Sequence, residues 1–389
     1  MAGQLPVVAY VRLLCIDGKL ILVLNTSPAD EQPLGYWMEG TSMRRAEVVS
    51  IVAGNARPRT GRGGTNAGRP IGRMIDSLLD FSVVGGYTRW GYEARSRLQG
   101  WPPDPPPGTL AGKVALVTGA NAGLGKATAT GLARLGARVH LVVRNVEKGR
   151  RARDEIGAEL GSADLTVWRC DVSDLDDVAR FAAEFAAAQP RLDVLVHNAG
   201  VLPATRQTSA QGHELTLATH VLGPLLLTES LRPTLAAAGQ SRVIWVSSGG
   251  MYTQGLPTDD LEYRSGQYRG STAYARTKRV QVALLPLLDH RWRSDGIAVH
   301  AMHPGWADTA GVASSLPGFH RVMRPALRDA EQGADTAVWL AAVVPPPASG
   351  KLWHDRRTRS PHRLPWTRHD EGEVRGVWRR LAGVVGIEP

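Results

Sequence analysis

Six short runs rich in valine, leucine and isoleucine alternate with Ala- and Leu-rich stretches of helix length from Lys113 onward. Alternation of this kind requires parallel strands joined by crossover helices, so the sequence predicts a single doubly wound parallel α/β sheet with helices on both faces. Nearly continuous apolar strands fit burial on both faces. The predicted strands are 114–117, 139–143, 165–168, 194–196, 243–246 and 297–302.

The first strand runs directly into a glycine-rich turn, and a helical pattern follows. Gly119, Gly123 and Gly125 lie four and two residues apart in this turn. Such glycines let the backbone turn sharply and approach a pyrophosphate, whose charge sits at the helix N-terminus. A lone motif of this spacing can be an ordinary tight turn, but in the first strand-turn-helix unit it predicts nucleotide binding by a Rossmann-type domain.

Arg144 follows the second strand, in the place where an acidic residue would hold a ribose 2′-hydroxyl. A cation there attracts a 2′-phosphate instead. Arg144 therefore predicts NADP(H) in preference to NAD(H), with Lys148 or Arg150 as helpers. The alternative is a solvated surface arginine.

Two further turns follow the third and fourth strands. Asp171 and Val172 are positioned to border the adenine of the nucleotide. Asn198, Ala199 and Gly200 form a small-residue turn that lets the backbone approach the cofactor.

Residues 271–288 combine Ala, Arg, Lys, Gln and Leu, and they are predicted to be helical. The i, i+4 spacing then puts Tyr274 and Lys278 on one face of the helix. A fixed cation near a phenol favours its ionised form, which lowers a pKa that is ordinarily about 10. The pair alone is weak evidence, because an exposed polar helix face explains it as well.

The net charge of +10 is concentrated at the ends of the chain. Residues 1–73 and 351–389 each hold nine Lys/Arg against five Asp/Glu, which is a net of +4 at each end. A duplex-binding surface needs cations clustered on the folded domain, so we expect no nucleic-acid partner. Cys15 and Cys170 provide neither a disulfide framework nor metal-ligand spacing, so we expect no metal site and a cytoplasmic protein. The apolar run 7–24 is interrupted by charges and fits neither a signal peptide nor a membrane span.

The N-terminal part divides by composition. Strands at 13–15 and 20–24 around Asp17-Gly18 predict a hairpin, whereas the Gly- and Arg-rich residues 53–73 predict a disordered linker. Met74 opens an amphipathic pattern. Residues 1–73 are therefore either a misplaced upstream translation, with the biological start at Met74, or a genuine small appendage.

Residues 74–108 predict a leader and a boundary. The leader, residues 74–99, is expected to be an amphipathic helix packed on the domain; the alternative is an interfacial helix that touches a membrane through Arg73, Arg89, Arg95 and Arg97. The Pro-rich run 101–108 can be neither helix nor central strand.

The catalytic domain is predicted to span 109–353, with 351–353 as a closing edge strand. The basic tail, 354–389, is interpreted as solvated, with packing on the domain or contact with a partner or an acidic membrane as alternatives.

Five motifs in a fixed order resemble the short-chain dehydrogenase/reductase superfamily over residues 113–352: 118–125, 198–200, Ser247-Ser248, Tyr274 with Lys278, and Pro304-Gly305. Segments 246–251, 302–309, 316–320 and 332–336, and residues 87–95 of the leader, are similar to its family member 12 subgroup. The resemblance implies an alcohol dehydrogenase or carbonyl reductase, for which Arg144 predicts NADP(H) as the cofactor.

The resemblance also implies roles for individual residues. Tyr274 would be the acid/base, Lys278 would bind the nicotinamide ribose and lower the pKa of Tyr274, and Ser248 would bind the substrate oxygen, with Ser247 in support. Homo-oligomers would pair through the helices that precede and include the Tyr274 segment. The implied cofactor-binding residues are Gly119, Asn121, Gly123, Leu124, Gly125, Arg144, Asp171, Val172, Asn198, Ala199, Gly200, Tyr274, Lys278, Pro304, Gly305 and Thr309.

His220 departs from the pattern, because the family carries an asparagine there that helps hold a water in the proton relay. Histidine, with a pKa near 6.5, would make such a relay pH-sensitive. The alternative is a neutral core histidine in a weakened site, which would leave a nucleotide-binding interaction protein with little turnover.

The 25-residue connection between Ser248 and Tyr274, together with residues 306–325, is predicted to roof the substrate pocket. Apolar and aromatic residues in these segments indicate a lipophilic alcohol or carbonyl substrate: Tyr252, Leu256, Leu261, Tyr263, Trp306, Leu316, Phe319 and Met323. Packing within the loop explains each residue equally well.

Overall fold

The computed structural model describes residues 7–16, 19–28, 76–77, 79–80, 82–98, 100–308, 320–321 and 323–388, in two compact units, Met1–Ile71 and Gly72–Pro389. In the first unit, β1 (Val7–Ile16) and β2 (Lys19–Pro28) pair antiparallel with Ile16 opposite Lys19. This pairing confirms the predicted hairpin, with longer strands than expected. The predicted linker, 53–73, lies outside the described residues.

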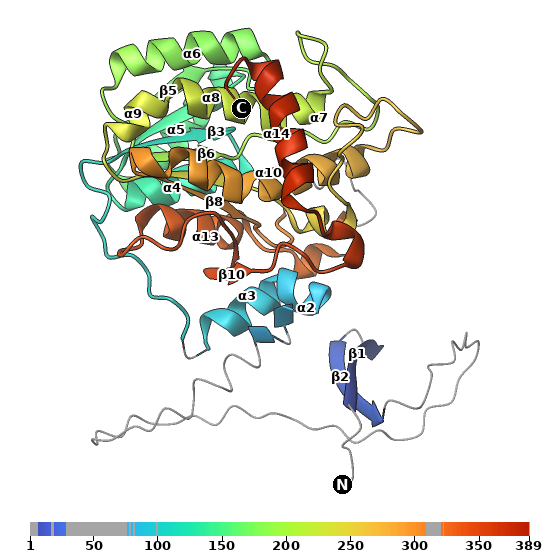
Figure 1. Ribbon diagram of the computed structural model, residues 1–389. Coiled ribbons are helices and arrows are strands. Elements are labelled where there is room, and N and C mark those ends of the chain that lie inside the picture. Colours follow the sequence, from blue (N-terminus) through green and yellow to red (C-terminus); the bar gives the residue numbers. More distant parts are fainter. Residues whose placement is uncertain are drawn as a thin grey trace. The chain divides into compact units, whose positions relative to one another are not determined.

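One eight-stranded sheet forms the centre of the second unit, in the order β10-β9-β8-β7-β6-β3-β4-β5 (Figure 1). Neighbours from β9 through β5 pair in parallel, and β10 pairs antiparallel with β9. Strand order reverses between β3 and β6, which is where ligands bind in open α/β sheets. All six predicted strands are confirmed: β3 (Val114–Thr118), β4 (Arg138–Val143), β5 (Leu165–Arg169), β6 (Val194–His197), β7 (Ser241–Val246) and β8 (Ile297–Met302).

Helices cover both faces of the sheet, as expected for a doubly wound fold. Ala115 and Val117 of β3 share a core with the helices of one face, α4 (Gly123–Arg134), α5 (Val146–Leu160) and α13 (Ala330–Ala342). Val114 and Leu116 share a core with those of the other face, α6 (Leu175–Ala188), α8 (Gly223–Ser230) and α10 (Gly270–Trp292). The shorter elements are α7 (Leu215–Leu217), the π-helix η1 (Ala218–Leu222), α9 (Arg232–Ala236), η2 (Gly249–Thr253), η3 (Arg293–Asp295), η4 (Arg324–Ala326) and η5 (Pro365–Thr367).

Where one helix was predicted, the described residues of the leader are helical at 76–77 and 79–80 and in two short helices, α2 (Val83–Tyr87) and α3 (Arg89–Ser96). The break lies at Thr88, whose side chain accepts a hydrogen bond from the Gly91 N–H and caps α3. Arg89 and Arg97 are exposed, but Arg95 is only 2% exposed and pairs with Asp76. Arg95 is therefore not available for a lipid surface, which corrects that part of the interfacial alternative.

The C-terminal residues are folded onto the domain, so the solvated-tail interpretation is wrong. β9 (Lys351–His354) is present as predicted, but β10 (Arg357–Arg359) lies outside it and forms the edge. A further helix, α14 (Glu371–Val385), begins at a capping box of Asp370 and Glu373 and contacts α10 (Figure 1). Its buried face follows the 3.6-residue period: Val377, Trp378, Leu381, Ala382 and Val385.

Within the described ranges, no helix combines the length and the apolar character needed to cross a bilayer.

Candidate active site

The glycine turn between β3 and α4 is shaped by close backbone contacts. Gly119 has a φ of +67°, and a Cβ there would lie 2.9 Å from the Cα of Ala199. A Cβ at Gly125 would lie 2.3 Å from Nδ2 of Asn198. The N-cap of α4 is Ala122, which has no side-chain acceptor, so the first N–H groups of the helix lack a side-chain cap. This cradle fits a nucleotide pyrophosphate.

Asn198 ties the end of β6 to the end of β3. Its Nδ2 donates to the carbonyl oxygens of Thr118 at 2.9 Å and Gly119 at 3.3 Å. The backbone N–H groups of Asn198 and Ala199 both donate to Oγ1 of Thr118 at 3.0 Å. The Asn198 side chain therefore holds the glycine turn in shape.

Arg144 and Asp171 lie just beyond the neighbouring ends of β4 and β5. The Arg144 side chain is 68% exposed, and its Nη1 lies 3.8 Å from Oδ2 of Asp171. The other carboxylate oxygen, Oδ1, accepts hydrogen bonds from the N–H and the hydroxyl of Ser173. Val172 is buried, and its carbonyl oxygen would lie 1.9 Å from a Cβ at Gly223. Arg144 is thus an accessible cation beside the glycine turn.

The expected helix around Tyr274 is confirmed as α10, and it brings Tyr274 and Lys278 together. The Nζ of Lys278 lies 5.4 Å from the centroid of the Tyr274 ring and donates to the carbonyl oxygen of Val246 at 2.8 Å. Burial lowers the pKa of Lys278 to about 7. Burial raises the pKa of Tyr274, and a hydrogen bond with the Ser248 side chain opposes that rise in part. Desolvation is therefore the largest influence on both groups, and the lowering of the Tyr274 pKa by Lys278 stays a prediction.

The two serines after β7 face different partners. Ser247 is buried, and its hydroxyl donates to the carbonyl oxygen of Lys278 at 3.3 Å. Ser248 Oγ accepts from the Gly250 N–H at 3.1 Å and hydrogen-bonds with Tyr274. Ser247 thus contacts the backbone of α10, and Ser248 contacts the phenol.

His220 is a buried, neutral histidine with both ring nitrogens occupied. The backbone N–H of Val201 donates to Nε2 at 3.0 Å, so the proton of the neutral ring is on Nδ1, which donates to Oγ1 of Thr277 at 2.8 Å. The ring meets that of Tyr274 edge to face at a centroid distance of 5.2 Å. Burial and the charge of Lys278 lower the pKa of His220 well below 6.5. The expectation of a pH-sensitive relay through His220 is therefore wrong.

The turn after β8 is buried against the leader. Gly305 has a φ of +76°, and a Cβ there would lie 2.5 Å from Nε of Arg328 and 2.7 Å from the carbonyl oxygen of Tyr87. Pro304 is buried, and its carbonyl oxygen accepts from Nη1 of Arg328 at 3.3 Å. Thr309 lies outside the described residues.

The remaining predicted contacts, Asn121 and Leu124, are half-buried in the glycine turn and at the start of α4. Leu124 packs against Gly333 of α13. The fold also brings several predicted residues to the same edge of the sheet as Tyr274: Asn121, Gly123 and Gly200. They share this edge because the segments that carry them follow the carboxyl ends of the neighbouring strands β3, β6 and β7.

A cavity of about 810 Å³ lies at the opposite edge of the sheet, at the amino ends of β7 and β8. It is lined by residues such as Ser241, Asp289 and Ile297. Its volume is large, but it lies apart from Tyr274 and Ser248.

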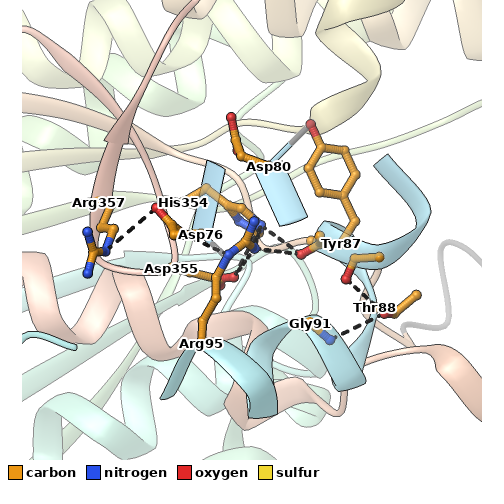
Figure 2. A network of polar contacts seen from close by, with 12 residues as sticks. Asp76, Asp80, Tyr87, Thr88, Gly91, Arg95, His354, Asp355 and Arg357 are labelled. Atoms are coloured by element: carbon orange, nitrogen blue, oxygen red, sulfur yellow. Dashed lines mark hydrogen bonds and ion pairs between the residues drawn. The ribbon is translucent and has the colours of Figure 1, made fainter. Parts of the chain in front are cut away.

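Sequence reasoning missed a polar cluster beside the site (Figure 2). Asp355 accepts from Nη1 of Arg95 at 2.7 Å and from Nη1 of Arg328 at 2.6 Å. These three side chains are all buried. The only sequence signal for this cluster was the resemblance of residues 87–95 to a subgroup leader. That signal does not identify the partners of these residues, which lie more than 200 residues away in the sequence.

The matching family is the short chain dehydrogenase family, whose model covers residues 113–317. The chain belongs to this family. Human Dehydrogenase/reductase SDR family member 12 is 40% identical over 280 residues, which are 71% of this chain and 86% of that protein. Human Retinol dehydrogenase 13 is 31% identical over 293 residues, which are 73% and 88% of the two chains. The short-chain dehydrogenase is thus similar to the family member 12 subgroup, as the motifs predicted.

Solved structures of other proteins share the fold. A crystal structure of an uncharacterized protein from Mycobacterium Paratuberculosis has a TM-score of 0.58 at 27% identity and covers 73% of this chain and 97% of its own. An NAD(P) dependent gluconate 5-dehydrogenase from Beutenbergia cavernae, with bound NADP at low occupancy, has a TM-score of 0.53 at 28% identity and covers 64% and 96%. The Rossmann-type sheet of this short-chain dehydrogenase is therefore confirmed.

The buried Lys278 generates a prediction about stability. Its folded pKa of about 7 lies below the ordinary value near 10.4, so the unfolded chain binds more protons between these values. The free energy of unfolding of the nucleotide-free protein should therefore rise between pH 7 and pH 9, and Lys278→Met should remove much of that rise. Urea unfolding at the two pH values measures it. The exposed Lys351→Met is the control and should keep the rise; an unchanged rise in Lys278→Met would contradict the assignment.

Proposed function

We propose that this short-chain dehydrogenase is an NADP(H)-dependent oxidoreductase that interconverts an alcohol and a carbonyl group on a lipophilic small molecule. The observation that carries the proposal is the meeting of Tyr274, Ser248 and Lys278 at the carboxyl end of β7, on the edge that also holds the glycine turn. The printed names of the relatives Retinol dehydrogenase 12 and Retinol dehydrogenase 13 support an alcohol as one partner of the reaction.

The chain's own groups supply the proton transfer. When bound, the nicotinamide supplies the hydride exchange. The Tyr274 hydroxyl exchanges a proton with the substrate oxygen, and Ser248, already hydrogen-bonded with that phenol, stabilises charge on the same oxygen. Because the pKa of Tyr274 is raised, its protonated form is favoured and suits proton donation to a carbonyl.

The cofactor preference rests on the electrostatics of the strand ends. The uncapped N-terminus of α4 and the glycines before it suit a pyrophosphate, and the exposed guanidinium of Arg144 suits a 2′-phosphate. A short-chain dehydrogenase structure from Escherichia coli CFT073 complexed with NADPH, at 25% identity and a TM-score of 0.52, also supports a nicotinamide cofactor.

His220 supports a second candidate, a nucleotide-binding interaction protein with little turnover. Both of its ring nitrogens are bonded within the protein, and its carbonyl oxygen accepts from Nε2 of Gln281 at 2.8 Å. The ring therefore has no nitrogen left to hold a relay water. Loss of a positioned proton-transfer group weakens rather than abolishes such chemistry, by about 10²–10⁴-fold.

The predicted homo-oligomer stays a proposal. Pairing through the Tyr274 helix must accommodate α14, which contacts both α10 and η1, and whose Trp378 ring lies 5.4 Å from the guanidinium carbon of Arg291. The peripheral membrane contact also stays a proposal, with Arg89 and Trp90 as exposed leader residues.

Tyr274→Phe tests the reaction. It removes the hydroxyl and keeps the ring against His220, so NADPH oxidation with lipophilic aldehydes and ketones should fall by about 10²–10⁴-fold while NADPH affinity is retained. Absorbance at 340 nm and fluorescence titration measure the two quantities. Full turnover in Tyr274→Phe would exclude Tyr274 as the acid/base. Tight NADPH binding without turnover by the wild type on any substrate would favour the interaction protein.

Arg144→Ala tests the cofactor preference. Loss of a charge-assisted hydrogen bond costs about 1.5–3 kcal/mol, so the Kd for NADPH should rise roughly 10- to 100-fold while the Kd for NADH stays the same. Fluorescence titration with both nucleotides measures this. The control is Arg134→Ala, an exposed arginine at the far end of α4 that pairs with Glu159. Equal weakening of NADPH and NADH by Arg144→Ala would contradict a role at the 2′-phosphate.

A further inference from the structure

We infer that the leader forms part of the wall of the active site and that Tyr87 is a positioning residue for Ser248. The inference rests on the proposed function, in which Ser248 binds the substrate oxygen. Tyr87 lies on α2, ahead of the segment that the family model matches.

The ring of Tyr87 packs directly against the turn that carries Ser248. A Cβ at Gly249 would lie 2.7 Å from Cε2 of Tyr87, closer than a side chain tolerates. Ser248 is the N-cap of η2, and its Oγ accepts from the N–H of Gly250. Gly249, which lies between the two partners of this hydrogen bond, thus packs on the aromatic ring, so the ring sets where Ser248 Oγ meets Tyr274.

The same residue also supports the turn after β8. Its carbonyl oxygen accepts from the backbone N–H of Trp306 at 2.8 Å. Its ring meets His303 edge to face at 4.5 Å, Trp306 at 6.0 Å and His354 at 5.3 Å. Tyr87 is 2% exposed. It therefore bridges the turns at the carboxyl ends of β7 and β8, the two turns to which the substrate and nicotinamide contacts are assigned.

Buried arginines hold Tyr87 in place through the backbone of α2. The carbonyl oxygens at the end of a helix lack intrahelical partners. Here Arg328 donates to the carbonyl oxygens of Gly86 at 2.9 Å and Tyr87 at 3.1 Å, and Arg95 donates to that of Gly86 at 2.8 Å. Asp355 forms ion pairs with both guanidiniums; Figure 2 labels Arg95 and Asp355 of this cluster. The C-terminal end of α2 is thus clamped to the turn between β9 and β10.

The ring of Tyr87, and not its hydroxyl, makes these contacts. The hydroxyl is buried and has no hydrogen-bond partner among the residues that the structure describes. Tyr87→Phe should therefore preserve the positioning, whereas Tyr87→Leu removes the aromatic edge that supports Gly249. The two variants form a matched pair in the full chain.

The test is a double-mutant cycle of Tyr87→Leu with Ser248→Ala, read as kcat for the carbonyl reaction. A misplaced Ser248 should lower kcat between about 10- and 100-fold in Tyr87→Leu, with Tyr87→Phe close to wild type. Because the effect passes through Ser248, Tyr87→Leu should lower kcat little further in the Ser248→Ala background. Multiplicative losses in the double variant, or equal kcat values in Tyr87→Leu and Tyr87→Phe, would overturn the inference.

Hydrogen exchange provides a readout that needs no turnover. Peptides covering 247–254 should exchange faster in Tyr87→Leu, and also in Gly249→Ala, which presses a methyl group against the same ring. Peptides covering 138–160, on β4 and α5, should be unchanged and exclude general unfolding. If the wild type turns over no substrate, the proposed function fails, and exchange at 247–254 still decides the inference. No local change in either variant would overturn it.

Discussion

The architecture around the site depends on the ion pairs that the Asp355 carboxylate forms. This carboxylate is 1% exposed and pairs with Arg95 of the leader and Arg328 ahead of α13. Burial raises the pKa of Asp355, but the charges of Arg328 and its neighbours outweigh this and hold the pKa well below its usual range. Asp355 and Arg356 form the two-residue connection of the β9–β10 hairpin with φ values of +51° and +55°, a conformation that costs non-glycine residues about 1–3 kcal/mol each. The buried ion pairs offset this strain and fix the leader beside Ser248.

At Tyr274 and Lys278, by contrast, burial is the largest influence on the pKa. Without nucleotide, desolvation favours the protonated phenol of Tyr274 and brings the pKa of Lys278 down to about 7. The Val246 carbonyl accepts only one of the three hydrogen bonds that the Lys278 ammonium can donate. A ribose hydroxyl that accepted another would stabilise its charged form, and that charge would in turn favour ionisation of Tyr274. Under the proposed function, Lys278 would therefore couple nucleotide binding to the proton affinity of the site.

Much of the fold could be predicted from the sequence, because its signals are local. The six strands and α10 follow from short-range patterns, and Gly119 and Gly125 from the demands of one turn. The neutral state of His220 could not be predicted, because it depends on Val201 and Thr277, which approach only in the folded chain. The ion pair between Asp355 and Arg95 could not be predicted either, because the two residues are 260 residues apart in sequence. The C-terminal residues differ from the prediction for another reason. The apolar period of α14 and its Asp370–Glu373 capping box are local signals of a packed helix, whereas the excess of arginine around them is typical of a solvated segment.

The free energy of unfolding of Asp355→Asn, measured beside that of the wild type from pH 7 down to pH 3, tests this account most directly. Removing one partner of a buried ion pair costs about 3–5 kcal/mol, so Asp355→Asn should be less stable by that order at pH 7. Because the pKa of Asp355 is lower in the folded chain, its contribution is present above the ordinary value of about 4 and fades as the pH falls below it. The difference between the two proteins should therefore shrink toward pH 3. Equal stability at pH 7 would contradict the claim that this carboxylate holds the leader to the sheet.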